Sequence, residues 1–133
     1  MRATADSVRA QILAILTAWG MPRDLAEETA TVMLDTDLMG VDSHGIGMLA
    51  SYEGMRRAGQ VKLDARPTVL REGGPVALVD GGAGLGHPAA AFAMRLAVKK
   101  AKEVGVGAVA VVNSHHFGAA GWYSRQAAAE GCV

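Results

Sequence analysis

The side chains best suited to proton transfer in this sequence are its four histidines, which fall in three short motifs. His44 stands in "GVDSHGI", directly after Ser43, and His87 stands in "GLGHPAA". His115 and His116 stand side by side in "VVNSHHFGAAGW". An imidazole, with an unperturbed pKa of about 6.5, can accept or donate a proton near neutral pH. The sequence therefore contains candidates for acid/base chemistry, provided that its helices and strands bring them to one site.

The Ser43-His44 motif lies where the spacing predicts the start of a helix. A helix N-terminus presents unpaired N–H groups and a positive dipole end, which favours an anionic ligand. Ser43 could orient His44 or bind a substrate oxygen. The alternative is that Ser43 is only the N-cap and His44 is a surface residue. The local pattern by itself favours this alternative.

The histidine pair follows a predicted apolar strand and precedes a predicted helix. In α/β proteins, ligands bind beyond the carboxyl ends of strands. Adjacent side chains point in different directions, so at most one of His115 and His116 would face a given site. Gly118 would let a ligand or another backbone segment approach closely. The alternative, equally favoured by the local pattern, is a polar loop whose Asn and Ser side chains satisfy turn hydrogen bonds.

Two further motifs are weaker. Residues 84–89, "GLGHPA", fit the dinucleotide fingerprint G-x-G-x-x-A between a predicted strand and helix. No acidic residue ends a second strand about 20 positions later, where the ribose partner is expected, so a structural turn is favoured. A metal site is the competing use of the histidines. Because no H-x-x-x-H or C-x-x-C spacing is present, the sequence predicts no metal site, and only one assembled by tertiary contact stays open.

Apolar periodicity, glycine and proline indicate the elements that must position these motifs. Three helices are predicted first, at about residues 5–19, 24–39 and 43–59, the second opened by a capping box of Asp24 and Glu27. The predicted remainder is two strands, a helix, a strand buried on both faces and a last helix, at about 68–71, 76–80, 88–103, 106–112 and 119–130. The order of three helices and then ββαβα predicts an α/β protein. We expect a helical segment over residues 1–62 and an α/β domain over 63–133.

Composition excludes several classes of function. Thirteen basic and thirteen acidic residues cancel, so neither a nucleic-acid surface nor an anionic-membrane surface is expected. No apolar run approaches the roughly 20 residues that a membrane helix requires. One cysteine cannot form an internal disulfide, which favours a reducing compartment. We expect a soluble, cytoplasmic protein.

Taken together, "GVDSHGI", "ALVDGGAGLGHPAAAFAM" and "VAVVNSHHFGAAGWYSRQAAAEG" resemble the malate/L-lactate dehydrogenase family of the non-classical type. Ureidoglycolate, sulfolactate and diketogulonate oxidoreductases and imine-reducing enzymes are its relatives. The motifs stand in the family's order and cover nearly the whole chain. The resemblance implies a mixed α/β sheet that is not of the Rossmann type. It also implies NAD(P)-dependent hydride transfer between a 2-hydroxy acid and a 2-keto acid, a small-molecule substrate and a homodimer.

The resemblance also implies roles for individual residues. The histidine of the family's S-H-G motif is its proton donor and the serine before it is the relay, which are His44 and Ser43 here. In some members the histidine of the H-F-G motif has the acid/base role instead, and that position is His116. The segment from that histidine onward lines the NAD or NADP cofactor, which implies contacts from His116, Phe117, Gly118, Ala119 and Ala120. We expect His44 to be the acid/base, with His116 rather than His115 close to nicotinamide and substrate.

Two departures from the family pattern stand out. Many members carry an arginine four residues after the S-H-G histidine, where it can hold a substrate carboxylate, and Met48 stands there. Family members are also much longer, so we expect the N-terminal portion of a truncated or split member, with its α/β domain incomplete. Both departures favour an alternative function, a catalytically silent binding or assembly module of the same fold. The residues do not specify which acid is the substrate, or NAD against NADP.

Overall fold

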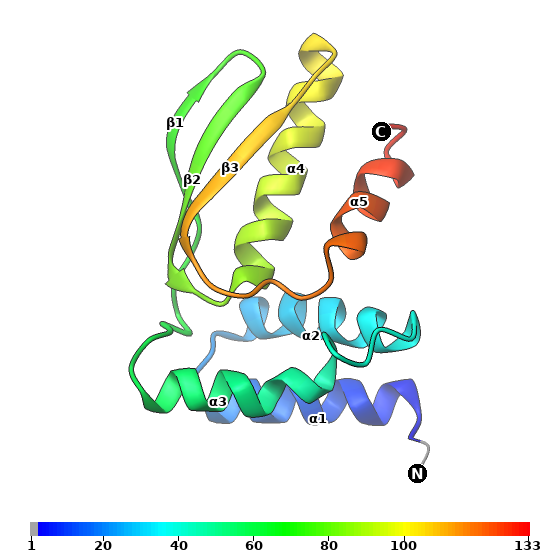
Figure 1. Cartoon of the computed structure of the whole chain (residues 1–133), viewed down its shortest axis with the longest axis vertical. Helices are drawn as coiled ribbons and strands as arrows, with labels where there is room; N and C mark the ends of the chain where they lie inside the picture. The colour runs from blue at the N-terminus through cyan, green and yellow to red at the C-terminus, as the bar shows by residue number, and fades with distance from the viewer. Residues whose placement is uncertain (1–2) are drawn as a thin grey trace.

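The computed structural model describes residues 3–133, and its elements follow the predicted order of three helices and then ββαβα. The helical part contains α1 (Ala5–Ala18), α2 (Arg23–Leu38), the 3₁₀ turn η1 (Ile46–Met48) and α3 (Leu49–Arg57). The α/β part contains β1 (Thr68–Gly73), β2 (Val76–Gly84), α4 (Gly86–Val104), β3 (Ala108–Ser114) and α5 (Ala120–Ala129). Figure 1 shows the α/β part above the helical part. Within the helical part, α2 is the helix nearest to the α/β part.

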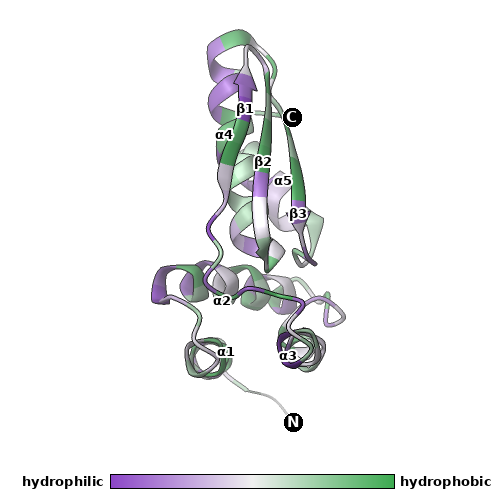
Figure 2. Ribbon diagram, turned by 90° about the vertical axis from the view of Figure 1, so that its left-hand side faces the viewer, coloured by the Kyte–Doolittle hydropathy of each residue, from purple (hydrophilic) through white to green (hydrophobic). Residues whose placement is uncertain are grey.

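The helical part is held together by one apolar core. α1 buries Ile12, Leu13 and Leu16, the face that its apolar periodicity predicts. Met33 of α2 and Tyr52 of α3 are fully buried in the same core. Figure 2 shows α1 and α3 end-on below α2, so the apolar stripes of the three helices meet in the space between them.

Two predicted helix caps are wrong. α2 begins at Arg23 after Pro22, close to the predicted start, but it has no side-chain cap. Asp24 lies within the first turn of the helix and pairs with Arg66 at 2.6 Å, while Glu27 pairs with Arg23 at 2.6 Å. Ser43 is not an N-cap either, since η1 begins only at Ile46.

The sheet is mixed, as expected, with strand order β1-β2-β3. β1 pairs antiparallel with β2, and β2 pairs parallel with β3 through the α4 crossover. α4 covers the face of the sheet on which Ala77 and Val79 are buried. α5 packs on α2 and α4 through Trp122, whose Nε1 donates a hydrogen bond to Asp35 Oδ2 at 2.9 Å. This contact joins the last helix to the helical part.

The prediction that the strand near residues 106–112 is buried on both faces is wrong. β3 is an edge strand, and Val112 on the face away from α4 is 43% exposed. The physical reason is that, within residues 3–133, no fourth strand pairs with β3 and no helix covers its outer face. The apolar run that indicated double burial is present, but only one of its faces is covered.

A buried lysine joins α4 to the hairpin of β1 and β2. Lys100 is only 3% exposed, and its Nζ donates hydrogen bonds to the carbonyl of Gly74 at 3.0 Å and to Glu72 Oε1 at 3.1 Å. Its methylene stem lies among apolar side chains while the ammonium reaches the turn. The neighbouring Lys99 is exposed and lies 4.0 Å from Glu103.

We expect Lys100→Ala to lower the free energy of unfolding by about 1–3 kcal/mol, because the hairpin loses two hydrogen bonds, one of them charged on both sides. Lys99→Ala is the matched control and should change it by less than about 0.5 kcal/mol, as exposed positions usually do. Urea denaturation followed by tryptophan fluorescence measures both. Equal losses in the two variants would contradict a specific role for Lys100.

Candidate active site

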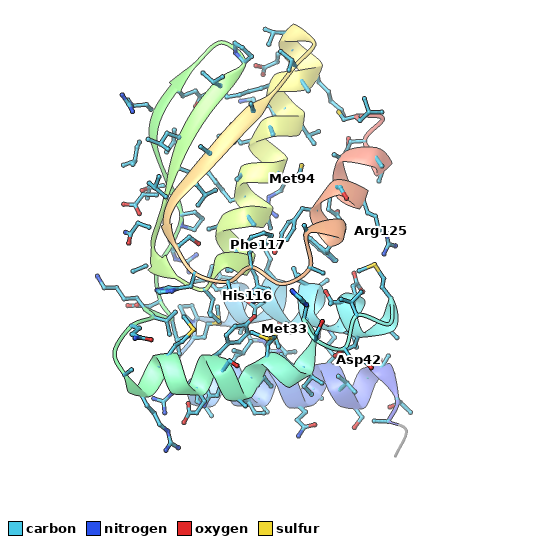
Figure 3. All side chains as sticks on the ribbon, in the orientation of Figure 1. Met33, Asp42, Met94, His116, Phe117 and Arg125 are labelled. Carbon is cyan, nitrogen blue, oxygen red and sulfur yellow. The ribbon has the colours of Figure 1, made fainter. Side chains whose placement is uncertain are left out.

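The candidate site lies where the helical part meets the α/β part, and two loops form it. The loop between α2 and η1 carries Ser43 and His44, and the loop between β3 and α5 carries His115 and His116. The ring centroids of His44 and His116 are 5.2 Å apart. Figure 3 shows His116 and Phe117 at this junction. The fold thus brings together two motifs that are far apart in the sequence.

The first loop is fixed by a carboxylate of α2. Asp37 Oδ2 accepts a hydrogen bond from the backbone N–H of Ile46 at 2.8 Å. A Cβ on Gly45 would come within 1.7 Å of this carboxylate, so glycine is required for the chain to pass. On this loop, Ser43 Oγ and His44 Nδ1 are 2.8 Å apart. That bond occupies Nδ1 and leaves Nε2 as the nitrogen of His44 that can meet a substrate.

Two hydrogen bonds to Nδ1 hold the ring of His116. Its Nδ1 lies 2.8 Å from the hydroxyl of Tyr52 and 3.3 Å from the backbone N of Gly118, which donates to it. Partial burial and then the nearby charge of His44 lower the pKa of His116. The imidazole is therefore more strongly biased toward its neutral form than a solvated histidine would be.

His87 continues this cluster into the core. Its ring is fully buried and its Nε2 lies 3.4 Å from the hydroxyl of Tyr52. Burial, with a smaller contribution from His116, lowers the pKa of His87 to about 3. Burial also raises the pKa of Tyr52, so its phenol stays protonated. The site therefore rests on uncharged hydrogen-bonding groups.

Sequence reasoning did not include Tyr52 and His87 among the site residues. Tyr52 fits the apolar spacing of a helix, and that spacing does not identify the hydrogen-bond partners of its hydroxyl. His87 stands in the glycine-rich turn, and its local pattern did not assign it a role. A usable signal was present, since a histidine in the first turn of an otherwise alanine-rich buried helix is a polar group that needs a partner.

The second histidine of the pair is turned elsewhere. His115 Nε2 donates a hydrogen bond to the backbone carbonyl of Gln60 at 2.9 Å, whereas His116 is bonded to Tyr52. The loop itself leaves the sheet at Asn113, which has a positive φ of 52° and donates from Nδ2 to Asp80 Oδ1 at 2.9 Å. This left-handed residue, held by a carboxylate of the neighbouring strand, turns the chain toward the site.

An open groove runs beside the site, between β3, α4 and α5. Its volume is about 620 Å³, within the range of small-molecule clefts, and apolar and small side chains predominate in its lining. Of the five residues expected to line the cofactor, Phe117 and Ala120 line this groove. Of the two adjacent histidines, His115 lines it and His116 does not, which differs from the expectation that His116 alone would do so. Gly118 is buried against His87, and His116 faces the histidine cluster. Phe117 presents a planar ring at this groove and is 42% exposed.

Two negative findings concern residues 3–133 only. This part of the chain contains no group of three or more histidine, cysteine, aspartate and glutamate side chains placed to hold a metal ion. It also contains no helix that combines the length and the apolar character needed to cross a membrane.

Known proteins match the chain along its whole described length. A family model described as malate/L-lactate dehydrogenase matches residues 3–133. Malate dehydrogenase of Pyrococcus horikoshii is 40% identical over 133 residues, which are 100% of this chain and 37% of that protein. A (2R)-3-sulfolactate dehydrogenase (NADP(+)) of Chromohalobacter salexigens is 41% identical over 121 residues, 91% of this chain and 36% of that protein.

Solved structures agree with these relatives. The crystal structure of malate dehydrogenase from Entamoeba histolytica matches with a TM-score of 0.96 and 34% identity, over 100% of this chain and 37% of that chain. The chain therefore spans little more than a third of the length of the proteins that it resembles.

The buried histidine predicts how stability depends on pH. A free histidine titrates near pH 6.5, whereas folded His87 has a pKa of about 3, so below pH 6.5 the unfolded chain binds more protons. The stability that depends on neutral His87 is therefore fully present above pH 6.5 and is lost as the pH falls toward 3. We expect the titration of His87 to lower the free energy of unfolding by on the order of 1 kcal/mol per pH unit between pH 6 and 4.5. His116 acts in the same direction, because its pKa is also lowered.

His87→Gln removes that titration and should flatten the decline of Tm with falling pH. His115→Gln is the control, because its ring is bonded to the backbone of Gln60 outside the buried cluster. Thermal unfolding by circular dichroism at half-unit pH steps measures all three proteins. A decline as steep in His87→Gln as in the unaltered chain would show that another group causes it.

Proposed function

The chain belongs to the malate/L-lactate dehydrogenase family, and on that premise we propose that it supplies the acid/base part of a dehydrogenase site. The reaction is hydride transfer between a nicotinamide cofactor and a 2-hydroxy acid or its 2-keto acid. The observation that carries the proposal is the meeting of His44 and His116, with ring centroids 5.2 Å apart, beside an open apolar groove.

His44 is the acid/base of the proposed reaction. When the alcohol is oxidised, its hydroxyl proton passes to His44 Nε2 as the C–H bond breaks, and in the reverse direction His44 returns the proton to the carbonyl oxygen. The bound nicotinamide supplies the acceptor or donor of the hydride. Ser43, 2.8 Å from His44 Nδ1, orients the ring and serves as the relay through which the proton leaves.

The groove between β3, α4 and α5 is where we propose that the cofactor binds, with its nicotinamide toward His116. Phe117 would stack on the cofactor, and Ala120 is small enough to leave room beside it. The other residues of the segment, from Gly118 to Ala119, would contribute by shaping the loop. Either NAD or NADP is a candidate, and the name of the Chromohalobacter salexigens relative includes NADP(+).

The substrate is a small 2-hydroxy acid of the malate, lactate, sulfolactate or ureidoglycolate kind. Its carboxylate needs a cationic partner, and Met48 cannot be that partner because a thioether carries no charge; its half-buried side chain packs against the core of the helical part. We propose that a cationic residue elsewhere binds the carboxylate. Met48 is also the observation that favours the alternative, a silent module that binds the cofactor without turnover.

Cofactor binding is tested first, by titrating the purified chain with NADH and NADPH and following nicotinamide fluorescence. The two phenylalanines of the chain are a matched pair, because Phe117 lines the groove and Phe92 lies on another face of α4. Phe117→Ala should raise the Kd about tenfold, equivalent to about 1.4 kcal/mol of lost stacking, and Phe92→Ala should leave it within about twofold. Equal Kd values in both variants would place the cofactor elsewhere.

Catalysis is tested on protein purified from its natural source or expressed at its natural length. We expect His44→Ala to lower kcat by about 10²–10⁴-fold, because no other group at that place exchanges the substrate proton, and to leave the cofactor Kd unchanged. Asp42→Asn, an exposed neighbour on the same loop, is the control. Reduction of NAD⁺ and NADP⁺ is followed with malate, lactate and sulfolactate. Cofactor binding without turnover of any 2-hydroxy acid would favour the silent module.

A further inference from the structure

A second pair of polar side chains lies next to the two histidines of the proposed reaction. That reaction assigns no role to this pair. Tyr52 and His87 are both fully buried. The hydroxyl of Tyr52 stands between two imidazoles, 3.4 Å from His87 Nε2 and 2.8 Å from His116 Nδ1. The three rings form a continuous cluster, with Tyr52 edge-on to His87 at 5.6 Å between centroids.

The direction of the hydrogen bonds in this cluster is set by one backbone group. The N–H of Gly118 points at His116 Nδ1 at 3.3 Å, and a backbone N–H can only donate. Nδ1 of His116 must then be the unprotonated nitrogen, and the hydroxyl of Tyr52 must donate to it as well. The single proton of the Tyr52 hydroxyl is then directed at His116, so only a lone pair of its oxygen faces His87 Nε2. A proton on His87 Nε2 makes that contact a hydrogen bond, whereas an unprotonated Nε2 would place two lone pairs together.

We propose that Tyr52 and His87 are positioning residues that hold His116 in a single tautomer, with the proton on Nε2. The bonds run from His87 Nε2–H to the oxygen of Tyr52, and from Tyr52 O–H to His116 Nδ1. His116 then presents an N–H donor at the site, in an orientation that its bond to Tyr52 fixes.

The arrangement costs stability, which argues against mere packing. With Nε2 of His87 protonated, its Nδ1 is a buried acceptor with no hydrogen-bond partner in the structure. Such an atom is a penalty that an apolar ring of the same size would avoid. The backbone of Gly118 covers the ring of His87. A Cβ on Gly118 would stand 3.1 Å from His87 Nε2, and Gly118 also has a positive φ of 79°. The backbone thus lies directly on the ring, where a side chain would push it away.

The tautomer divides the chemistry between the two histidines, a consequence that rests on the proposed function. A neutral His116 with its proton on Nε2 has no lone pair there to accept the hydroxyl proton of a substrate. It can donate a hydrogen bond to the substrate oxygen and stabilise the negative charge that develops on it. The base must then be His44, whose Nδ1 is paired with Ser43.

The test reads the tautomer directly in the 133-residue chain labelled with ¹⁵N at histidine, with neither cofactor nor substrate present. Long-range ¹H–¹⁵N correlation spectra distinguish protonated from unprotonated ring nitrogens. We expect His116 to show an unprotonated Nδ1 and a protonated Nε2 at neutral pH. Tyr52→Phe should abolish this pattern and move both nitrogens toward the averaged positions of a ring that exchanges tautomers.

The matched control is Tyr123→Phe, the other tyrosine of the chain, which is also buried but donates its hydroxyl proton to the carbonyl of Phe117. It should leave the nitrogen shifts of His116 unchanged. At the far end of the cluster, His87→Gln keeps an N–H donor for Tyr52 and should retain the pattern, whereas His87→Phe should weaken it.

A protonated Nδ1 on His116 in the unaltered chain would overturn the proposal, as would the same single tautomer in Tyr52→Phe. Neither outcome depends on cofactor binding, so the proposal and the dehydrogenase function can fail separately. In an active protein, Tyr52→Phe should lower kcat while the Kd for NADH stays within about twofold. A matching loss in Kd would instead mark Tyr52 as a structural support of the whole site.

Discussion

The loop that carries His116 passes so close to the start of α4 that only the absence of a side chain permits it. The backbone N–H of Gly86 donates to the carbonyl of His116 at 3.0 Å, and that of His115 donates to Gly84 at 3.2 Å. A Cβ on Gly86 would stand 2.3 Å from the carbonyl oxygen of His115. These two bonds set the height of the loop above the helix. The contact of His116 with Tyr52, and through it the position of the whole cluster, depends on that height.

The same passage explains why polar groups occupy a region that could have been apolar. His87 lies in the first turn of α4, in contact with Tyr52 of α3 and with Gly118 of the histidine loop. Charge is excluded there by burial, so the cluster works with neutral donors and acceptors whose directions are fixed. Asn113, near the end of β3, adopts a positive φ that asparagine tolerates, and its side chain is bonded to Asp80.

The order of the elements could be predicted because glycines such as Gly20, Gly40 and Gly59 follow the helices that periodicity indicates. Helix caps were less predictable, since Asp24 fits a capping box locally but lies inside the first turn of α2, where it pairs with Arg66. For Ser43 the sequence left two roles open, and the structure has its Oγ 2.8 Å from His44 Nδ1. The hydroxyl of Tyr52 was not foreseen, because an apolar spacing describes a ring and leaves its polar tip undetermined. Double burial of β3 failed for a similar reason, since an apolar run does not reveal what covers it.

The exposed edge of β3 has a consequence for order in the histidine loop. An edge strand presents a row of unpaired N–H and C=O groups that can template a further strand. His116 follows the end of β3 by two residues, so a strand added at this edge would restrain Ser114 and, through it, the start of the loop. A strand that paired with β3 would therefore also reduce the mobility of the loop that carries His116.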